Sequence, residues 1–166
     1  MPRSGPRDLD KAALRDELLV RLDDMLTNAR VAHAAAAEGA THGESKAEND
    51  KDTRGLEQSY VARGQATRVV ELENALVLIG TLPVTPWPEG AAISAGALVT
   101  VRDDARTQRY LIAGVGGGIA LAGGAVQVVT PTSPLGQALC GKRAGDEAEL
   151  RGPAGRPRTL ELGDVA

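Results

Sequence analysis

The chain has 166 residues, enough for one large domain or two small ones, and its 42% hydrophobic content excludes a disordered tail. Only 2% of the residues are aromatic and none is Phe, which argues against a roomy aromatic-lined ligand pocket. The net charge is −3, and residues 38–52, with five acids and two lysines, account for all of it. The rest is neutral overall, so no broad basic face predicts duplex DNA as a ligand.

Residues 1–7 lack the apolar run of a signal peptide, and we expect them to be disordered. The single cysteine, Cys140, excludes an internal disulfide and a cysteine-based zinc cluster. We expect it to be a small buried hydrophobic residue of a cytoplasmic protein. Residues 110–141 carry no charge, but glycines and two prolines interrupt them. They therefore predict strands and a turn, not a membrane span.

From residue 8 onward, apolar residues recur every three or four positions, as on one face of a helix. This first seam comprises Leu14, Leu18, Leu22, Met25, Ala29, Ala32 and Ala36. A second seam comprises Leu56, Ser59, Ala62, Ala66, Val69, Leu72, Leu76 and Ile79. Two glycines between the seams, Gly39 and Gly43, are predicted to break the helix and turn the chain. Residues 8–79 thus predict an antiparallel helical hairpin, of coiled-coil type, with an acidic tip near residues 39–52.

The two predicted seams change in character along their length. Leucines gather at the base, whereas alanine and serine face one another near the turn. Small side chains allow the helices to approach closely but bury less apolar surface. The hairpin is therefore predicted to taper toward its acidic end, which should be its less stable part.

Residues 80–90 contain several prolines and predict a stiff, extended linker. Beyond it, residues 91–166 predict a small β-rich domain with one short helix, so the whole chain is of the α+β class. The expected strands are 96–102, 108–115, 125–130, 147–151 and 158–162. The expected helix is 133–141, with Ser133 as its N-cap, Pro134 in its first turn and Gly141 as its C-cap.

The segment Thr132-Ser-Pro-Leu-Gly-Gln-Ala-Leu-Cys-Gly-Lys-Arg-Ala-Gly-Asp146 resembles the C-terminal signature of the GreA/GreB transcript-cleavage factors of bacterial RNA polymerase. The order of hairpin, linker and β-rich domain resembles that family as well. The resemblance implies an FKBP-like C-terminal domain that docks at the rim of the polymerase secondary channel. It also implies that Ser133, Pro134 and Leu135 contact the polymerase, and that the hairpin enters the channel.

In that family, the hairpin tip carries a motif of the form Gly-Asp-x-x-Glu-Asn. The nearest stretch here is Gly43-Glu-Ser-Lys-Ala-Glu-Asn49, with Glu in place of Asp and one additional residue between the acids. A register counted back from the second helix instead places Glu48 and Lys51 at the acidic positions. The resemblance implies that Glu44, Glu48 and Asp52 act in the polymerase active centre, with Asn49 and Arg54 as further contacts.

Cleavage of RNA in the polymerase uses magnesium, which one or two protein carboxylates can hold beside water and phosphate. Glu44 and Glu48 could therefore share Mg²⁺ with the polymerase, while the chain needs no cofactor of its own. If the second helix has begun by Glu44, the i,i+4 spacing aligns Glu44, Glu48 and Asp52 on one face. The chain would then stimulate hydrolysis by the polymerase without being an enzyme, and would contact the RNA 3′ end only inside that complex.

Other interpretations stay open. An acidic run at a loop is also typical of a solvated turn. Lys46 and Lys51 among the acids favour a secondary-channel regulator that inhibits or tunes transcription without cleavage. A peptidyl-prolyl isomerase is disfavoured by the scarcity of aromatic residues, and a structural hairpin adaptor leaves the Ser133–Asp146 match unexplained. In every case we expect a monomer without membrane contact.

Overall fold

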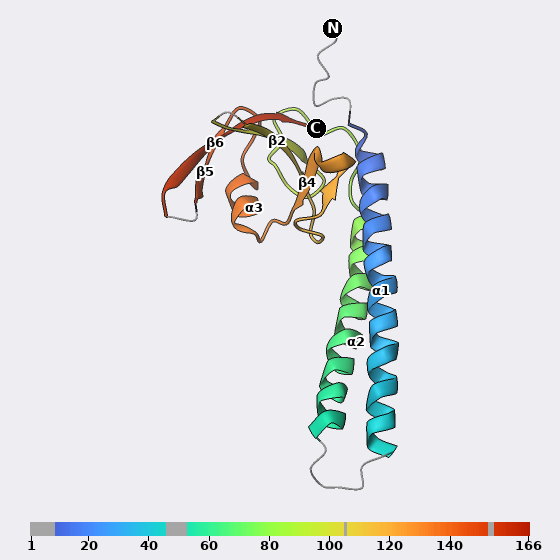
Figure 1. The fold of residues 1–166 in the computed structure, drawn as a ribbon. Coiled ribbons are helices and arrows are strands. Elements are labelled where there is room, and N and C mark those ends of the chain that lie inside the picture. The colour runs from blue at the N-terminus through green and yellow to red at the C-terminus, as the bar shows by residue number, and fades with distance from the viewer. Residues whose placement is uncertain (1–8, 46–52, 105, 153–154) are drawn as a thin grey trace. The chain divides into compact units, whose positions relative to one another are not determined.

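The computed structural model describes residues 9–45, 53–104, 106–152 and 155–166. The chain divides into two compact units. One comprises Met1–Leu19 together with Leu78–Ala166, and the other comprises Val20–Val77. Two long helices, α1 (Lys11–Ser45) and α2 (Thr53–Gly80), run side by side in opposite directions (Figure 1). The predicted antiparallel helical hairpin is therefore confirmed.

The seams that the sequence predicts are the buried faces of the two helices. On α1 the buried apolar residues are Leu14, Leu18, Leu22, Leu26 and Ala29. On α2 they are Leu72, Ala75 and Ile79. Two assignments are wrong: Leu56 of the second seam is 58% exposed, and Met25 of the first seam is 37% exposed, whereas Leu26 is 3% exposed. Four-residue steps from Leu14 to Leu26 keep these leucines on one side of the helix, so Leu26 takes the seam position assigned to Met25.

The predicted helix break at residues 39–43 is wrong, because α1 continues through both glycines to Ser45. Glycine inside a helix costs only about 1 kcal/mol relative to alanine and leaves the backbone hydrogen bonds intact. The Thr41 hydroxyl also bonds within the helix, donating to the Ala37 carbonyl at 3.0 Å. At Gly39, a methyl group would lie 3.1 Å from the Gln58 side chain. The missing side chain therefore allows close approach of the two helices instead of a turn.

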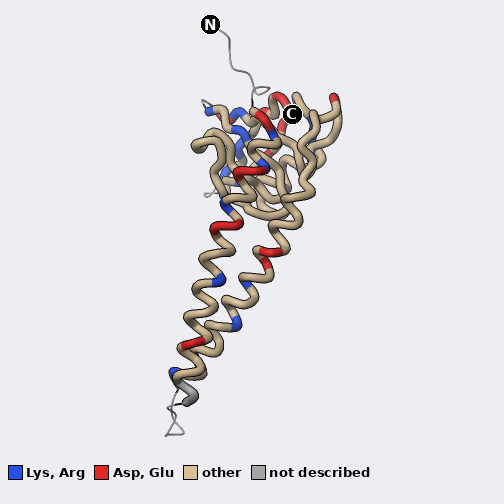
Figure 2. Tube along the Cα trace, turned by 90° about the vertical axis from the view of Figure 1, so that its right-hand side faces the viewer, with Lys and Arg blue, Asp and Glu red and all other residues tan. Residues whose placement is uncertain are grey.

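Burial within the Val20–Val77 unit decreases along the helices, as the sequence predicts. Leu22, Leu26 and Leu72 are buried, whereas Ala36 and Ala62 are only half-buried. A salt bridge joins Arg30 to Glu73 at 2.8 Å across the two helices, and both side chains are about half exposed. Charged residues are scattered along both helices of this unit (Figure 2). Less apolar surface is therefore buried around Ala36 and Ala62 than around Leu22.

The C-terminal part folds into one six-stranded mixed sheet with strand order β3-β4-β2-β1-β6-β5. The strands are β1 (Leu98–Asp103), β2 (Arg106–Ile112), β3 (Ala120–Leu121), β4 (Val126–Val129), β5 (Glu147–Arg151) and β6 (Pro157–Val165). Strands β2 and β4 are parallel, and the other neighbours are antiparallel. One short helix, α3 (Pro134–Leu139), lies beside the sheet (Figure 1).

The predicted α+β class is confirmed, and β5 matches the sequence prediction residue for residue. Strand β3 was not expected, because two residues are too few to show an alternating pattern. A short 3₁₀ turn, η2 (Ala122–Gly124), follows it. In the part of the chain that the structure describes, no helix is long and apolar enough to span a membrane.

The core of the sheet unit forms on the face that α3 covers. It is aliphatic, comprising Ile93, Ala97, Val99, Val101, Ile112, Val129, Leu139, Ala148, Leu160 and Leu162. Trp87 packs against this core, which confirms the prediction that it attaches the proline-rich segment to the domain. Cys140 also packs there, and burial raises the pKa of its thiol.

The first turns of α1 belong to the same unit as the sheet. The Lys11 ammonium donates to the Gly96 carbonyl at 3.2 Å and lies 5.4 Å from the centre of the Trp87 ring. Burial lowers the pKa of Lys11. Further along the helix, the Glu17 carboxylate accepts from the Ala122 amide at 2.9 Å. The start of the hairpin is thus anchored by a cation, a carboxylate and a cation–π contact.

Candidate functional site

The acidic stretch lies around the end of α1 and the start of α2. Glu44 belongs to the last turn of α1, while α2 begins at Thr53. The hypothesis that Glu44 and Glu48 share a face of the second helix is therefore wrong for Glu44. Glu48, Asn49 and Asp52 lie outside the described residues, so their predicted roles stay predictions. Arg54 is exposed in the first turn of α2.

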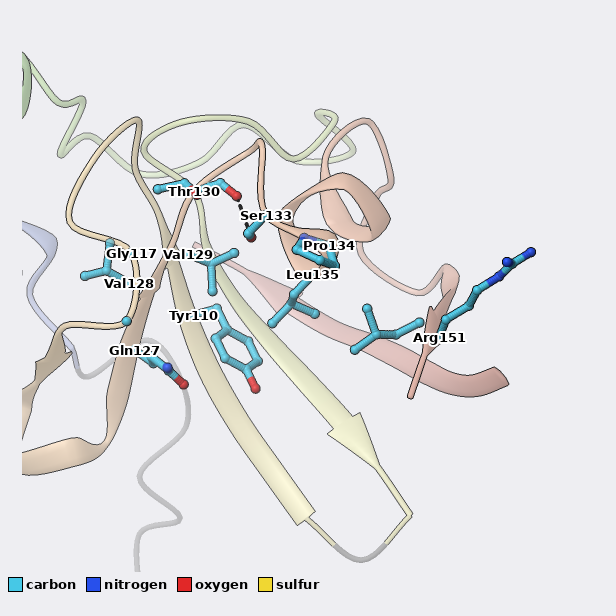
Figure 3. Close-up of a pocket in the computed structure, with 12 residues that line it drawn as sticks. Tyr110, Gly117, Gln127, Val128, Val129, Thr130, Ser133, Pro134, Leu135 and Arg151 are labelled. Carbon is cyan, nitrogen blue, oxygen red and sulfur yellow. Dashed lines mark hydrogen bonds between the residues drawn. The ribbon is translucent and has the colours of Figure 1, made fainter. Parts of the chain in front are cut away.

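The Ser-Pro motif is the start of α3. Ser133 is its N-cap: the hydroxyl accepts from the Gly136 amide at 3.1 Å. It also donates to the Thr130 carbonyl at 2.7 Å (Figure 3). Pro134 occupies the first turn, where its missing N–H costs no hydrogen bond. The predicted helix start, with Ser133 as N-cap and Pro134 in the first turn, is confirmed. The C-cap is Cys140 and not the predicted Gly141; Gly141 follows it with a φ of +83°, a conformation that glycine adopts without strain.

Gly136 explains why this motif has a glycine inside a helix. A Cβ built at this position would overlap the Thr130 carbonyl oxygen and come within 2.9 Å of the Pro131 Cα. These are backbone atoms held by the Ser133 cap, so they cannot yield cheaply. Gly136 and Ser133 therefore fix the loop before α3 and, with it, the exposed Pro134 and the half-buried Leu135.

An open groove lies across the sheet beside α3. Its first part, of about 510 Å³, includes Tyr110, Gln127 and Val129 on the strands, Ser133 to Leu135 on α3, and Leu150 and Arg151 on β5. A second part, of about 250 Å³, shares Tyr110, Gln127, Leu135 and Leu150 with the first. It adds Asp103, Arg106 and Arg158 at the ends of β1, β2 and β6. We call the two parts together the sheet groove.

The floor of the sheet groove is aliphatic with two polar groups. Figure 3 shows the Tyr110 ring below Leu135, with the Tyr110 hydroxyl and the Gln127 amide directed to the same side. Register pairs Tyr110 with Gln127 across β2 and β4. Burial raises the pKa of Tyr110, so its hydroxyl stays protonated at neutral pH and can donate a hydrogen bond. Tyr110 is the one aromatic residue among those that line the groove, as expected for a chain with so few aromatics.

The rim of the sheet groove is mostly cationic. Arg158 forms an ion pair with Asp103, whose side chain is 20% exposed. Arg106 and Arg151 form no ion pair with any residue that the structure describes, and both are exposed. By alternation, Glu149, Arg151 and Glu161 face the side of the sheet opposite Leu150 and Leu160, so Arg151 reaches the groove only at its edge, at the end of β5. The groove is therefore locally positive in a protein whose net charge is −3.

Of the predicted partner-binding residues, Ser133, Pro134 and Leu135 come together at this groove. Tyr110, Leu150, Arg106 and Arg151 were not predicted from the sequence. Each lies on or beside a predicted strand, but only the strand order brings β2 and β5 to the same groove. The one available signal was Tyr110 itself, a rare aromatic in the middle of a strand. In the described part of the chain, no group of three His, Cys, Asp or Glu could hold a metal ion.

Fold and site together define a helical-hairpin protein whose sheet domain presents a Ser-Pro-capped helix beside an open groove. A family model described as "Transcription elongation factor, GreA/GreB, C-term" matches residues 88–166. Transcription elongation factor GreA of Xanthomonas campestris is 33% identical over 80% of this chain and 79% of its own length. GreA of Saccharopolyspora erythraea is 29% identical over 89% of this chain and 86% of its own length.

The chain belongs to the GreA/GreB family of transcription elongation factors. Among solved structures, the crystal structure of GreA factor homolog 1 (Gfh1) of Thermus thermophilus is 21% identical. The match covers 89% of this chain and 94% of that chain, with a TM-score of 0.38.

Proposed function

We propose that this chain binds RNA polymerase through the secondary channel and stimulates cleavage of backtracked RNA. The observation that carries the proposal is the pairing of a helical hairpin with the fixed Ser133–Gly136 turn in a chain of the GreA/GreB family. The sheet domain docks at the rim of the channel through Ser133, Pro134 and Leu135. The acidic end of the hairpin enters the channel, and one chain acts per polymerase, in the cytoplasm.

The acids Glu44, Glu48 and Asp52 supply the chemical contribution of the chain. Carboxylates are the ligands that Mg²⁺ prefers, and one or two of them suffice where water and phosphate complete the shell. Glu44 and Glu48 fit that donor set by residue type. A bound Mg²⁺ would supply a hydroxide nucleophile and stabilise the leaving oxygen. Asn49 and Arg54 contact the partner complex, where the RNA 3′ end lies.

A second candidate function is a regulator that occupies the channel without stimulating cleavage. Two observations favour it. Glu44 lies on α1 and not on the second helix, so it lacks the helical alignment with Glu48 that the sequence suggested. Lys46 and Lys51 also lie among the acids in the sequence. Their positive charges would partly cancel the negative charge of the acids and so weaken the binding of a cation.

The experiment uses purified polymerase stalled in a backtracked complex with 3′-labelled RNA at millimolar magnesium. Wild type is compared with Glu44→Gln/Glu48→Gln and with the matched control Glu38→Gln, an exposed acid two turns earlier on α1. We expect faster release of short 3′ fragments with wild type and Glu38→Gln, and loss of that increase in the double variant while binding persists. Binding without faster cleavage would leave the regulator, and absence of binding would remove the polymerase as partner.

A further inference from the structure

The sheet has one long open edge, formed by β5. Among the described strands, β5 pairs with β6 alone and is the outermost strand on its side of the sheet (Figure 1). At the other edge, β3 has only two residues. An edge strand offers unpaired backbone N–H and C=O groups to an extended chain that lies beside it. Prolines and bulges commonly protect such edges, but β5 contains no proline and pairs with β6 in an unbroken register.

The hydrogen bonds at the two ends of β5 show which of its backbone groups face outward. The Leu162 amide donates to the Asp146 carbonyl, and the Gly152 amide donates to the Arg156 carbonyl, both at 2.9 Å. Because hydrogen bonds alternate along an antiparallel pair, the even-numbered residues of this segment bond to β6 and the odd-numbered ones face outward. The outward-facing residues, all with exposed side chains, are Glu147, Glu149 and Arg151.

The sequence of β5, Glu-Ala-Glu-Leu-Arg, is complementary to itself when two copies run antiparallel. With Glu149 opposite Glu149 of a second copy, Glu147 lies opposite Arg151, and Ala148 lies opposite Leu150. Each of these pairs forms twice, because a two-fold axis relates the copies. Opposite charges and apolar side chains at facing positions stabilise a pair of strands. This register also uses every outward-facing residue of both copies, whereas a shift by two residues leaves some of them unpaired.

One contact in this register is unfavourable. The two Glu149 side chains face one another at the two-fold axis, and like charges at facing positions destabilise a pair of strands. Arg151 of the second copy lies diagonally across from Glu149 and offsets part of this repulsion. Association through a single short strand with such a contact is weak, so it depends strongly on protein concentration.

We propose that β5 pairs with β5 of a second copy of this chain, so that two six-stranded sheets join into one continuous sheet. The free protein is then in equilibrium between dimer and monomer, and dilution returns it to the monomer expected from the sequence. A second copy fits this edge because β5 presents opposite charges at its two ends. The inference concerns the protein without polymerase, so its failure is distinct from failure of the proposed function.

The first test measures self-association of the full-length chain by sedimentation equilibrium between about 10 µM and about 1 mM. Arg151→Glu places a glutamate opposite Glu147, and we expect it to weaken dimerisation at least about tenfold. Glu147→Arg/Arg151→Glu exchanges the two charges and should restore the wild-type dissociation constant to within about threefold. The control is Arg63→Glu, the same charge change at an exposed position of α2, which should alter that constant less than about twofold.

Two results of the first test would overturn the proposal. One is a wild-type chain that stays monomeric at about 1 mM. The other is a double variant that associates as weakly as Arg151→Glu, since the two charges would then not face one another across the strands. Circular dichroism of each variant reports whether it is folded.

The second test locates the contact by amide hydrogen exchange at high and at low protein concentration. We expect exchange at Glu149 to slow at least about fivefold at high concentration, whereas exchange at Ala148, whose amide faces β6, changes less. Glu149→Pro removes an outward N–H without removing a bond to β6, so it should abolish association while the chain stays folded. Unchanged exchange at Glu149, or a folded Glu149→Pro chain that associates like wild type, contradicts pairing through β5.

Discussion

In the Val20–Val77 unit, side chains are buried along a single seam on each helix, and the seam changes from leucine to alanine toward residues 39–45. In the sheet unit, burial comes from strands far apart in the sequence: Val99, Ile112, Val129 and Leu160 share one core. The hairpin thus depends on repeated local spacing, whereas the sheet depends on close contacts between distant segments. The same substitution should therefore have different consequences in the two units.

We expect the largest difference between the two units when a glycine is replaced by alanine. Gly136→Ala should destabilise the sheet unit by about 3 kcal/mol, because the new methyl group meets the Thr130 carbonyl and the Pro131 backbone. Gly64→Ala, on an exposed position of α2 with no atom within 4 Å of the new methyl group, should stabilise the hairpin by about 0.7 kcal/mol. Urea unfolding measures both.

Two probes separate the units in that experiment. Trp87 is the single tryptophan and packs against the sheet core, so its fluorescence follows the sheet unit. Circular dichroism at 222 nm follows mainly the two long helices. Gly136→Ala should shift the fluorescence transition to lower urea, and Gly64→Ala should shift the dichroism transition to higher urea. A neutral Gly136→Ala variant would refute the steric account of the Ser-Pro-Leu-Gly motif.

Leucine substitutions sharpen the comparison within the hairpin. Leu22 is 2% exposed, and Leu22→Ala should cost about 3 kcal/mol through lost burial and the cavity left behind. Leu56 is 58% exposed, and Leu56→Ala should change stability by less than about 0.5 kcal/mol. Urea unfolding followed by circular dichroism gives the free energy of unfolding of each variant, and so compares the packing around Leu22 with the packing around Leu56. Equal costs would contradict a hairpin whose packing weakens away from Leu22.

The smallest expected effect concerns the Arg30–Glu73 salt bridge. Both side chains are about half exposed, so water and salt screen the pair. A double-mutant cycle with Arg30→Ala and Glu73→Ala should give a coupling energy of about 0.3 kcal/mol at low salt. That coupling should vanish in 1 M NaCl. A coupling above about 1 kcal/mol at high salt would mean that the ion pair, and not the apolar seam, aligns the helices.

The sequence by itself determined the hairpin, the taper and the capped helix α3. Each depends on spacing within a few residues: three- and four-residue steps for the seams, and Ser133, Pro134 and Gly141 for the helix ends. The match of Thr132–Asp146 to the family signature was also readable from the sequence, since it is a contiguous segment. Short-range geometry constrains such features strongly.

Only the tertiary structure showed that α1 passes through Gly39 and Gly43: the helix cost of glycine is modest, and at Gly39 the missing side chain leaves room for Gln58 of α2. The tertiary structure alone also determined which residues line the sheet groove. Tyr110 on β2, Leu135 on α3 and Leu150 on β5 line one groove although β1 and β6 lie between β2 and β5, an order that no local pattern encodes. Pairing between strands far apart in the sequence depends on the packing of the whole core. The groove could therefore not be predicted from the sequence.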